Sequence, residues 1–161
     1  MPTKSTPRKI HRSEAIVRVQ DASRSRRTPA EARFREWVRA AASGPTQVTV
    51  RLVGTTEARG LNLAFRGKDY ATNVLTFAYA PGLADIVLCP SVIVREAREQ
   101  GKPLKSHYAH LTVHAVLHLR GYDHALSSDA VRMERAEIRI LKRLGHANPY
   151  VIKASGAVPV Q

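Results

Sequence analysis

Four short stretches of the chain have the hydrophobic pattern of β-strands. Apolar and polar residues alternate along residues 14–20 and 47–52, as expected for strands with one buried face. Residues 74–79 and 84–89 are apolar stretches of strand length, and Pro81-Gly82 between them is typical of a tight turn. We therefore expect four strands, the last two of which pair as a hairpin.

Apolar residues recur at helical spacing in the segments between and after these strands. The first helix is expected to begin at Thr28-Pro29-Ala30-Glu31, which matches a capping box with proline at the first helical position. The expected helices span residues 28–44, 56–65, 90–101, 104–119 and 129–144. Strands that alternate with helices are typical of α/β proteins. The sequence thus predicts a single compact α/β domain with a mixed β-sheet of about four strands packed by helices.

The helix expected over residues 104–119 is apolar almost all round, which places it in the centre of the domain. His114 and His118 lie four apart on it and share one face, where a metal ion would satisfy both imidazoles. His124 extends the spacing to H-x3-H-x5-H, but a straight helix would carry it roughly 15 Å from His114. The chain must therefore turn back after His118. Gly121 stands where this turn is needed, because glycine adopts the left-handed conformation without steric penalty.

Three histidines in this arrangement predict an open zinc site on a central buried helix. Neutral imidazoles suit zinc, or another divalent transition metal, and three protein ligands leave a fourth position for water. Zinc proteases with a related motif place a glutamate after the first histidine, whereas this chain has Ala115, so a zinc protease or amidase is a less favoured alternative. His110 could orient a ligand, but the favoured interpretation is that it is an ordinary histidine at the edge of the site. His107 and His146 are expected on the surface.

The chain of 161 residues suits one domain and is strongly basic. Lysine and arginine number 26 against 13 acidic residues, a net charge of +13 that favours an anionic partner such as nucleic acid or an acidic membrane surface. Residues 1–13 are expected to be a basic, disordered extension, residues 14–150 the folded domain and residues 151–161 a loose tail.

The cellular location is inferred from what the sequence lacks. A single cysteine, Cys89, excludes an internal disulfide and fits a reducing compartment. No segment approaches the ~18 apolar residues of a membrane span, and the N-terminus lacks the apolar core of a secretory signal. We therefore expect a cytoplasmic protein without a membrane partner.

Two blocks of sequence resemble one protein family. Residues 62–77, NLAFRGKDYATNVLTF, and residues 114–124, HAVLHLRGYDH, are together similar to the YbeY family of bacterial endoribonucleases, the rRNA maturation factors. The resemblance extends over most of residues 14–150. It implies a compact α/β domain whose zinc ligands are His114, His118 and His124.

The same resemblance implies a function and partners. The family processes small-subunit rRNA, notably the 3′ end of 16S rRNA, and takes part in ribosome quality control. The implied partners are this rRNA, the 30S subunit or 70S ribosome, a small-subunit ribosomal protein and an assembly GTPase, and Arg66 matches the arginine that acts on the RNA phosphate. Three departures from the family pattern, at Tyr70-Ala71, Ala84 and Ala115, concern backbone shape and remove no expected ligand.

The resulting hypothesis is zinc-dependent phosphodiester cleavage in single-stranded RNA. Arg66 offers a planar fork for two phosphate oxygens, and Lys68 holds a neighbouring phosphate. An alternative role for Arg66 is a surface salt bridge with Asp69. An alternative function is that of a ribosome-assembly RNA-binding factor with a mainly structural zinc, which the high positive charge permits.

Overall fold

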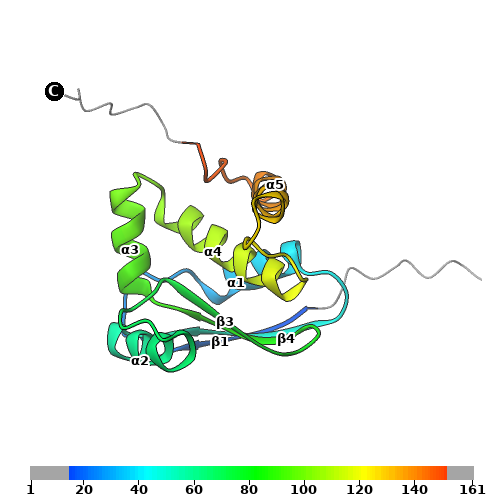
Figure 1. Cartoon of the computed structure of the whole chain (residues 1–161). Helices are drawn as coiled ribbons and strands as arrows, with labels where there is room; N and C mark the ends of the chain where they lie inside the picture. The colour runs from blue at the N-terminus through cyan, green and yellow to red at the C-terminus, as the bar shows by residue number, and fades with distance from the viewer. Residues whose placement is uncertain (1–14, 152–161) are drawn as a thin grey trace, which may run out of the picture.

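The computed structural model describes residues 15–151, which form a four-stranded β-sheet and five helices (Figure 1). The elements are β1 Ala15–Asp21, α1 Glu31–Ala41, β2 Thr46–Leu52, α2 Thr55–Arg66, β3 Val74–Ala80, β4 Leu83–Leu88, α3 Pro90–Glu99, α4 Leu104–Leu119 and α5 Ser127–Arg143. The expected α/β fold with a mixed four-stranded sheet is confirmed. The predicted N-terminal extension, and all but the first residue of the predicted tail, lie outside the described residues.

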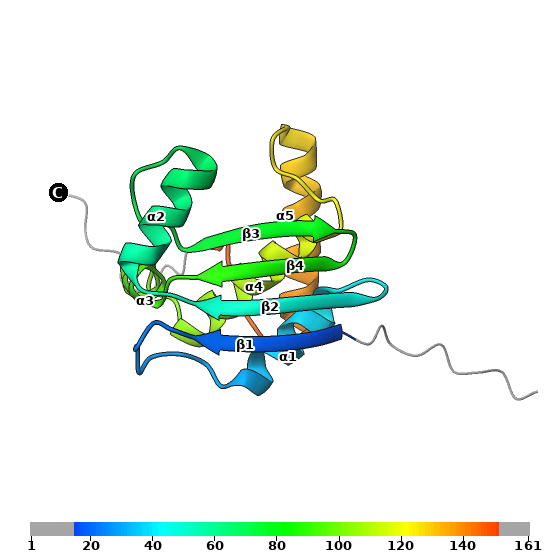
Figure 2. The same ribbon diagram turned by 90° about the horizontal axis from the view of Figure 1, so that it is seen from below.

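The sheet has the strand order β1-β2-β4-β3 (Figure 2). β1, β2 and β4 are parallel, whereas β3 pairs antiparallel with β4 at one edge. Parallel neighbours need a crossover connection, and α1 supplies it between β1 and β2. In the centre of the sheet Val50 lies opposite Val19 on one side and Ile86 on the other. Its side chain is fully buried in the core on the sheet face.

The predicted hairpin of β3 and β4 turns at Pro81-Gly82. Gly82 has a φ of 73°, and its carbonyl accepts a hydrogen bond of 2.7 Å from the N–H of Gln47. A Cβ atom at this position would lie 2.3 Å from the carbonyl oxygen of Pro45. The turn therefore requires glycine for two reasons, its backbone conformation and the close approach of the chain before β2.

The main core lies between the sheet and the helices α1, α4 and α5. Phe34 and Trp37 of α1 meet edge to face at 5.4 Å between ring centroids, and Phe34 meets Tyr108 of α4 in the same way at 6.2 Å. All three rings are buried, which fixes α4 against α1. A smaller cluster, which includes Ala58 and Cys89, packs α2 and α3 against β3 and β4. Cys89 is thus a core residue.

The start of α1 differs from the sequence expectation. The helix begins at Glu31, and its N-cap is Ala30, which has an extended backbone and makes no side-chain cap hydrogen bond. The capping box expected at Thr28 is therefore wrong. Ahead of the helix, the carbonyl of Arg27 accepts a hydrogen bond of 3.1 Å from the Tyr108 hydroxyl. This tertiary contact ties the segment ahead of the helix to α4.

The helix α4 is the centre of the domain, as its apolar composition predicts. It contacts α1, α3 and α5 as well as β3 and β4. Its buried residues occur all round the helix and include the polar Thr112, whose hydroxyl donates to the carbonyl of Tyr108 at 2.8 Å. His114 and His118 are half-buried, so α4 presents them at the border of the core.

Candidate metal centre

Three histidines converge at the C-terminal end of α4. His114 and His118 share one face of the helix, and their Nε2 atoms are 3.1 Å apart. The ring of His124 lies 5.7 Å from that of His114 and 5.2 Å from that of His118, between centroids. One ring nitrogen from each residue lies within 4.8 Å of the other two. The predicted meeting of a distant imidazole with two helical neighbours is therefore confirmed.

The reversal after α4 brings His124 to this position. Gly121 has a φ of 88°, and its N–H donates to the carbonyl of His118 at 3.0 Å. The next N–H, of Tyr122, donates to the carbonyl of Leu117 at 3.1 Å. These bonds satisfy carbonyls at the helix end and turn the chain back, as the sequence predicts for glycine at this place.

The donor set fits a metal ion. An ion bound tetrahedrally at about 2.0 to 2.1 Å from each nitrogen would hold the nitrogens about 3.4 Å apart. The Nε2 atoms of His114 and His118 are 3.1 Å apart, which is close to that value, and a nitrogen of His124 lies within 4.8 Å of both histidines. Burial, followed by the charges of His114 and His124, lowers the pKa of His118. A lower pKa favours the neutral imidazole, which is the form that binds a metal. Within residues 15–151, no Cys, Asp or Glu joins the three histidines as a fourth ligand.

A buried carboxylate that sequence reasoning missed contacts the first histidine. Glu137 of α5 is 0% exposed, and its Oε1 atom lies 2.5 Å from Nδ1 of His114. Its Oε2 atom accepts from Nε2 of His110 at 2.8 Å and from the hydroxyl of Tyr150. Burial alone would raise the pKa of Glu137, but the hydrogen bonds from His110, His114 and Tyr150 outweigh it and lower the pKa to about 2. Glu137 is therefore a carboxylate, which accepts hydrogen bonds only.

One signal in the sequence could have revealed Glu137. Glu137 stands on the apolar face of α5 beside Ala136 and Ile140. A charged residue on such a face must have hydrogen-bond or charge partners if it is buried. His110 contacts Glu137 and thereby shares a carboxylate with His114.

His107, which was expected on the surface, is only 4% exposed, so that expectation is wrong. Its Nε2 atom lies 3.1 Å from Oε1 of Glu96.

Arg66 and Lys68 lie on a different part of the chain from the histidines. Arg66 is the last residue of α2, Lys68 follows in the loop, and both side chains are exposed. The alternative salt bridge between Arg66 and Asp69 is wrong, because Asp69 pairs with Arg59 through contacts of 2.6 and 3.0 Å. In the part of the chain that the structure describes, neither Arg66 nor Lys68 has an acidic partner. Both cations are therefore available to an anionic ligand.

The loop that carries Lys68 is fixed to α2 from two sides. Asp69 of the loop forms an ion pair with Arg59 of α2. The buried side-chain amide of Asn62, also on α2, donates to the backbone carbonyl of Tyr70 at 2.8 Å. Gly67 ends α2 in the left-handed conformation, with a φ of 67°. These contacts hold Lys68 close to the helix end that carries Arg66.

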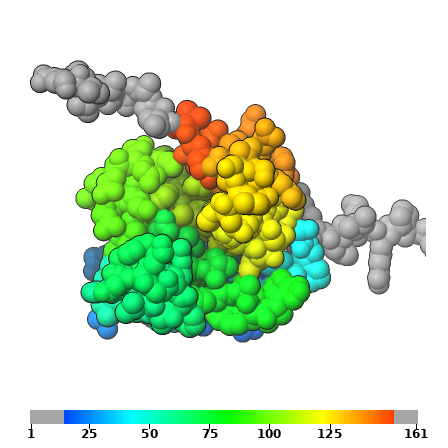
Figure 3. Space-filling model, viewed as in Figure 1, coloured from blue at the N-terminus to red at the C-terminus, as the bar shows by residue number. Residues whose placement is uncertain are grey.

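A hollow lies between these two parts of the molecule. Figure 3 shows it bordered by α2, by α3 and α4, and by the segment that leads from the end of α4 into α5. In Figure 2 the C-terminal end of α2 and the N-terminal end of α5 both extend past the edge strand β3. The segment after α4 carries His124, and the end of α2 carries Arg66, so the histidine and arginine elements border the same hollow.

Comparisons with known proteins show the family of this chain. The family model described as "Endoribonuclease YbeY" matches residues 17–145, which include the three histidines, Arg66, Lys68 and Glu137. The chain belongs to the YbeY family. A relative from Nitrosomonas europaea named "Endoribonuclease YbeY" is 48% identical over 163 residues, covering 95% of this chain and 99% of its own. Another of that name from Thiobacillus denitrificans is 53% identical over 142 residues, covering 85% and 97%.

A solved structure is similar in fold to this member of the YbeY family. The solution structure of a Thermotoga maritima protein matches with a TM-score of 0.52 and 22% sequence identity, covering 91% of this chain and 99% of its own. This match supports the fold. Among residues 15–151, none of the helices combines the length and the apolar character that crossing a lipid bilayer requires.

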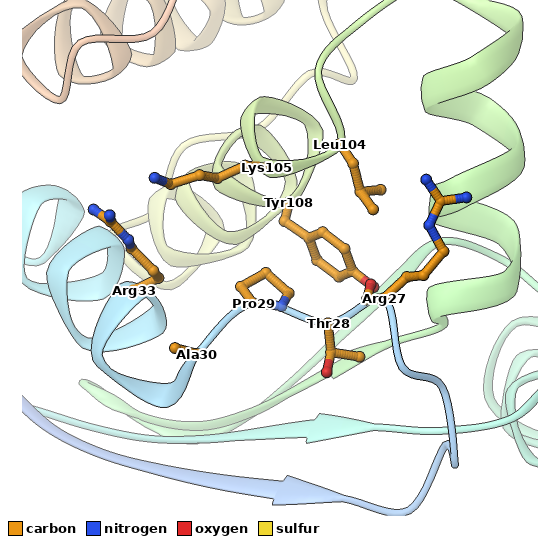
Figure 4. A pocket seen from close by; sticks show the side chains of 8 residues that line it. All are labelled: Arg27, Thr28, Pro29, Ala30, Arg33, Leu104, Lys105 and Tyr108. Carbon is orange, nitrogen blue, oxygen red and sulfur yellow. The ribbon is translucent and has the colours of Figure 1, made fainter.

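A second concave region lies away from the histidines. A cavity of about 380 Å³ opens between the N-terminal ends of α1 and α4, with Arg27, Arg33 and Lys105 around it and Tyr108 in its wall (Figure 4). It lies at the opposite end of α4 from His118, which at 1.5 Å per residue corresponds to roughly 15 to 20 Å along the helix. This cavity is therefore separate from the candidate metal centre.

Proposed function

We propose that this protein is a zinc-dependent endoribonuclease that cleaves phosphodiester bonds in single-stranded RNA. The observation that carries the proposal is the convergence of His114, His118 and His124 in a chain of the YbeY family. The relatives bear the name "Endoribonuclease YbeY", and the enzyme class is carried over from them. Zinc is the proposed metal because a site of three imidazoles suits it, and another divalent transition metal is the alternative.

The three histidines would hold the metal, and a neighbouring residue would orient one of them. Zinc bound by the three imidazoles would supply a Lewis acid for the phosphate group of the RNA. His114 would bind the metal through Nε2, because its Nδ1 atom is engaged by Glu137. His118, whose pKa is lowered by burial and by its histidine neighbours, offers a neutral nitrogen. His124 is exposed, so the site faces solvent on the side from which RNA approaches.

Arg66 is proposed to bind the phosphate on the opposite side of the hollow. Its guanidinium presents parallel N–H donors that match two phosphate oxygens. Lys68 is proposed to hold a neighbouring phosphate as a point charge. Support comes from the exposure of both side chains and from the pairing of Asp69 with Arg59, which leaves Arg66 without this competitor. The net charge of +13 favours an RNA partner in general.

We further propose a cytoplasmic role in ribosome maturation. The substrate is the 3′ end of 16S rRNA, and the protein acts in ribosome quality control on the 30S subunit or 70S ribosome. A small-subunit ribosomal protein and an assembly GTPase are the proposed protein partners. Support comes from the family resemblance of residues 62–77 and 114–124 and from the basic charge of the chain.

The test combines metal content with RNA cleavage. We expect purified protein to contain about one zinc per chain and to cleave a single-stranded RNA, and we expect a chelator to abolish cleavage until zinc is restored. A His114→Ala and His118→Ala double variant should lose both metal and cleavage, whereas Glu96→Gln, which alters a carboxylate–histidine contact outside the cluster, should retain both. RNA cleavage that survives complete metal removal would overturn the proposal.

One alternative is permitted by the high positive charge and by Ala115, which is fully buried and stands where metalloproteases have a catalytic glutamate. This alternative is an RNA-binding assembly factor in which zinc is mainly structural. It predicts that the double variant, if folded, still supports correct rRNA ends. A zinc protease or amidase predicts instead that the metal-loaded protein cleaves a peptide and leaves RNA intact.

A further inference from the structure

We propose that Glu137 and Tyr150 are positioning residues that hold His114 in the tautomer and orientation required to bind the metal. This inference rests on the proposed metal site and is independent of what the site cleaves. Glu137 lies on α5 and Tyr150 in the segment after it, so the site extends beyond the helix and turn that supply the histidines.

The tautomer of His114 follows from its contact with Glu137. The carboxylate can only accept, so the proton of the His114 ring lies on Nδ1, which is 2.5 Å from Oε1. The lone pair of Nε2 therefore points toward Nε2 of His118 at 3.1 Å. Two lone pairs at this distance repel each other unless a cation or a proton lies between them. The contact with Glu137 thus prepares His114 for a metal ion.

The second oxygen of Glu137 is held as firmly as the first. Oε2 accepts from Nε2 of His110 at 2.8 Å and from the hydroxyl of Tyr150. Nδ1 of His110 is buried and has no hydrogen-bond partner among residues 15–151, which agrees with the proton being on Nε2. With donors on both oxygens, rotation of the carboxylate away from His114 would break hydrogen bonds at both oxygens. A fixed acceptor also makes the ligand nitrogen more basic.

Tyr150 brings the chain after α5 back to α4. Its backbone N–H donates to the side chain of Asn148 at 2.9 Å, and its ring meets the ring of His110 edge to face at 5.4 Å between centroids. The tyrosine is 43% exposed, yet its hydroxyl reaches the fully buried Glu137. A phenylalanine would keep the ring contact and remove only the donor to the carboxylate.

The experiment compares Glu137→Gln and Tyr150→Phe with two matched controls. Glu96→Gln alters a carboxylate that contacts another histidine of α4, and Tyr79→Phe removes a hydroxyl that donates to Asp85 at 2.7 Å. Zinc affinity is measured by competition with a chromophoric chelator, and folding is checked by circular dichroism. In metal-free protein, ¹⁵N NMR of the histidine rings reports which nitrogen of His114 carries the proton.

We expect zinc affinity to fall about 10- to 100-fold in Glu137→Gln and about tenfold in Tyr150→Phe, with both controls unchanged. We also expect the Nδ1–H form of His114 in wild type and its loss or mixing with the other tautomer in Glu137→Gln. If Glu137→Gln does not fold, the zinc affinity of Tyr150→Phe alone tests the positioning role.

Three results are distinguishable. Folded variants that bind zinc as tightly as wild type would overturn the positioning role. A wild-type protein that binds no zinc would overturn the proposed metal site together with this inference. A wild type that binds zinc but cleaves no RNA would overturn the nuclease alone and leave the role of Glu137 supported by the affinity series.

Discussion

Acidification of the metal-free protein should remove the stability that Glu137 contributes. The carboxyl group is 0% exposed, and its usual pKa of 4.5 falls to about 2 because the hydrogen bonds from His110, His114 and Tyr150 outweigh the effect of burial. A lowered pKa means that the unfolded chain binds the proton more readily than the folded chain. The contribution is therefore fully present above about pH 5 and is lost as the pH falls toward about 2.

The magnitude follows from the size of this shift. The pKa of Glu137 falls from 4.5 to about 2. Each unit of pKa difference between the folded and unfolded chain is worth about 1.4 kcal/mol, so this change corresponds to about 3 kcal/mol of unfolding free energy. Of this free energy, about 2 kcal/mol should disappear between pH 6 and pH 3. At pH 3 the carboxyl group of Glu137 is still ionised in the folded chain but protonated in the unfolded chain. This is a large part of a typical domain stability of about 5 to 15 kcal/mol.

The assay is urea unfolding in the presence of a chelator, followed by fluorescence of Trp37, the only tryptophan of the chain and 1% exposed. Unfolding free energies of wild type and Glu137→Gln are compared from pH 6 to pH 3. The difference between the two proteins should narrow by about 2 kcal/mol over this range. A difference that stays constant down to pH 3 would refute the argument, since it would mean that the carboxyl titrates alike in both states.

Two further predictions concern the phosphate site and the hairpin. Arg66→Lys should retain zinc but reduce RNA cleavage by about tenfold or more, because lysine lacks the planar fork. Arg35→Lys, at an exposed ion pair with Glu31, is the control, and equal cleavage rates in both variants would count against the role of Arg66. Gly82→Ala should lower the unfolding free energy by about 2 kcal/mol or more, because φ is 73° and the Cβ would meet a carbonyl oxygen at 2.3 Å. By contrast Gly60→Ala, inside α2 with open space around it, should stabilise by about 0.5 to 1 kcal/mol in the same urea titration.

Local sequence determined the helices and strands, the hairpin turn and the convergence of the histidines. Each depends on residues close together in the chain. His114 and His118 meet because helical residues four apart share a face. His124 joins them because Gly121 permits the reversal within three residues of it. Periodicity and turn chemistry act over such short distances, so they can be read from the sequence alone.

Only the tertiary structure decided which partners distant residues would find. Glu137 is 23 positions from His114, and Tyr150 is a further 13 away, yet both belong to one hydrogen-bonded group. Asp69 could pair with Arg66 or Arg59, and the fold brings Arg59 to it. No local pattern encodes these choices, because they depend on how α5 and the segment after it pack against α4 and on how the loop after α2 folds back. The sequence therefore determined which residues could bind a metal, whereas packing decided which carboxylate contacts His114.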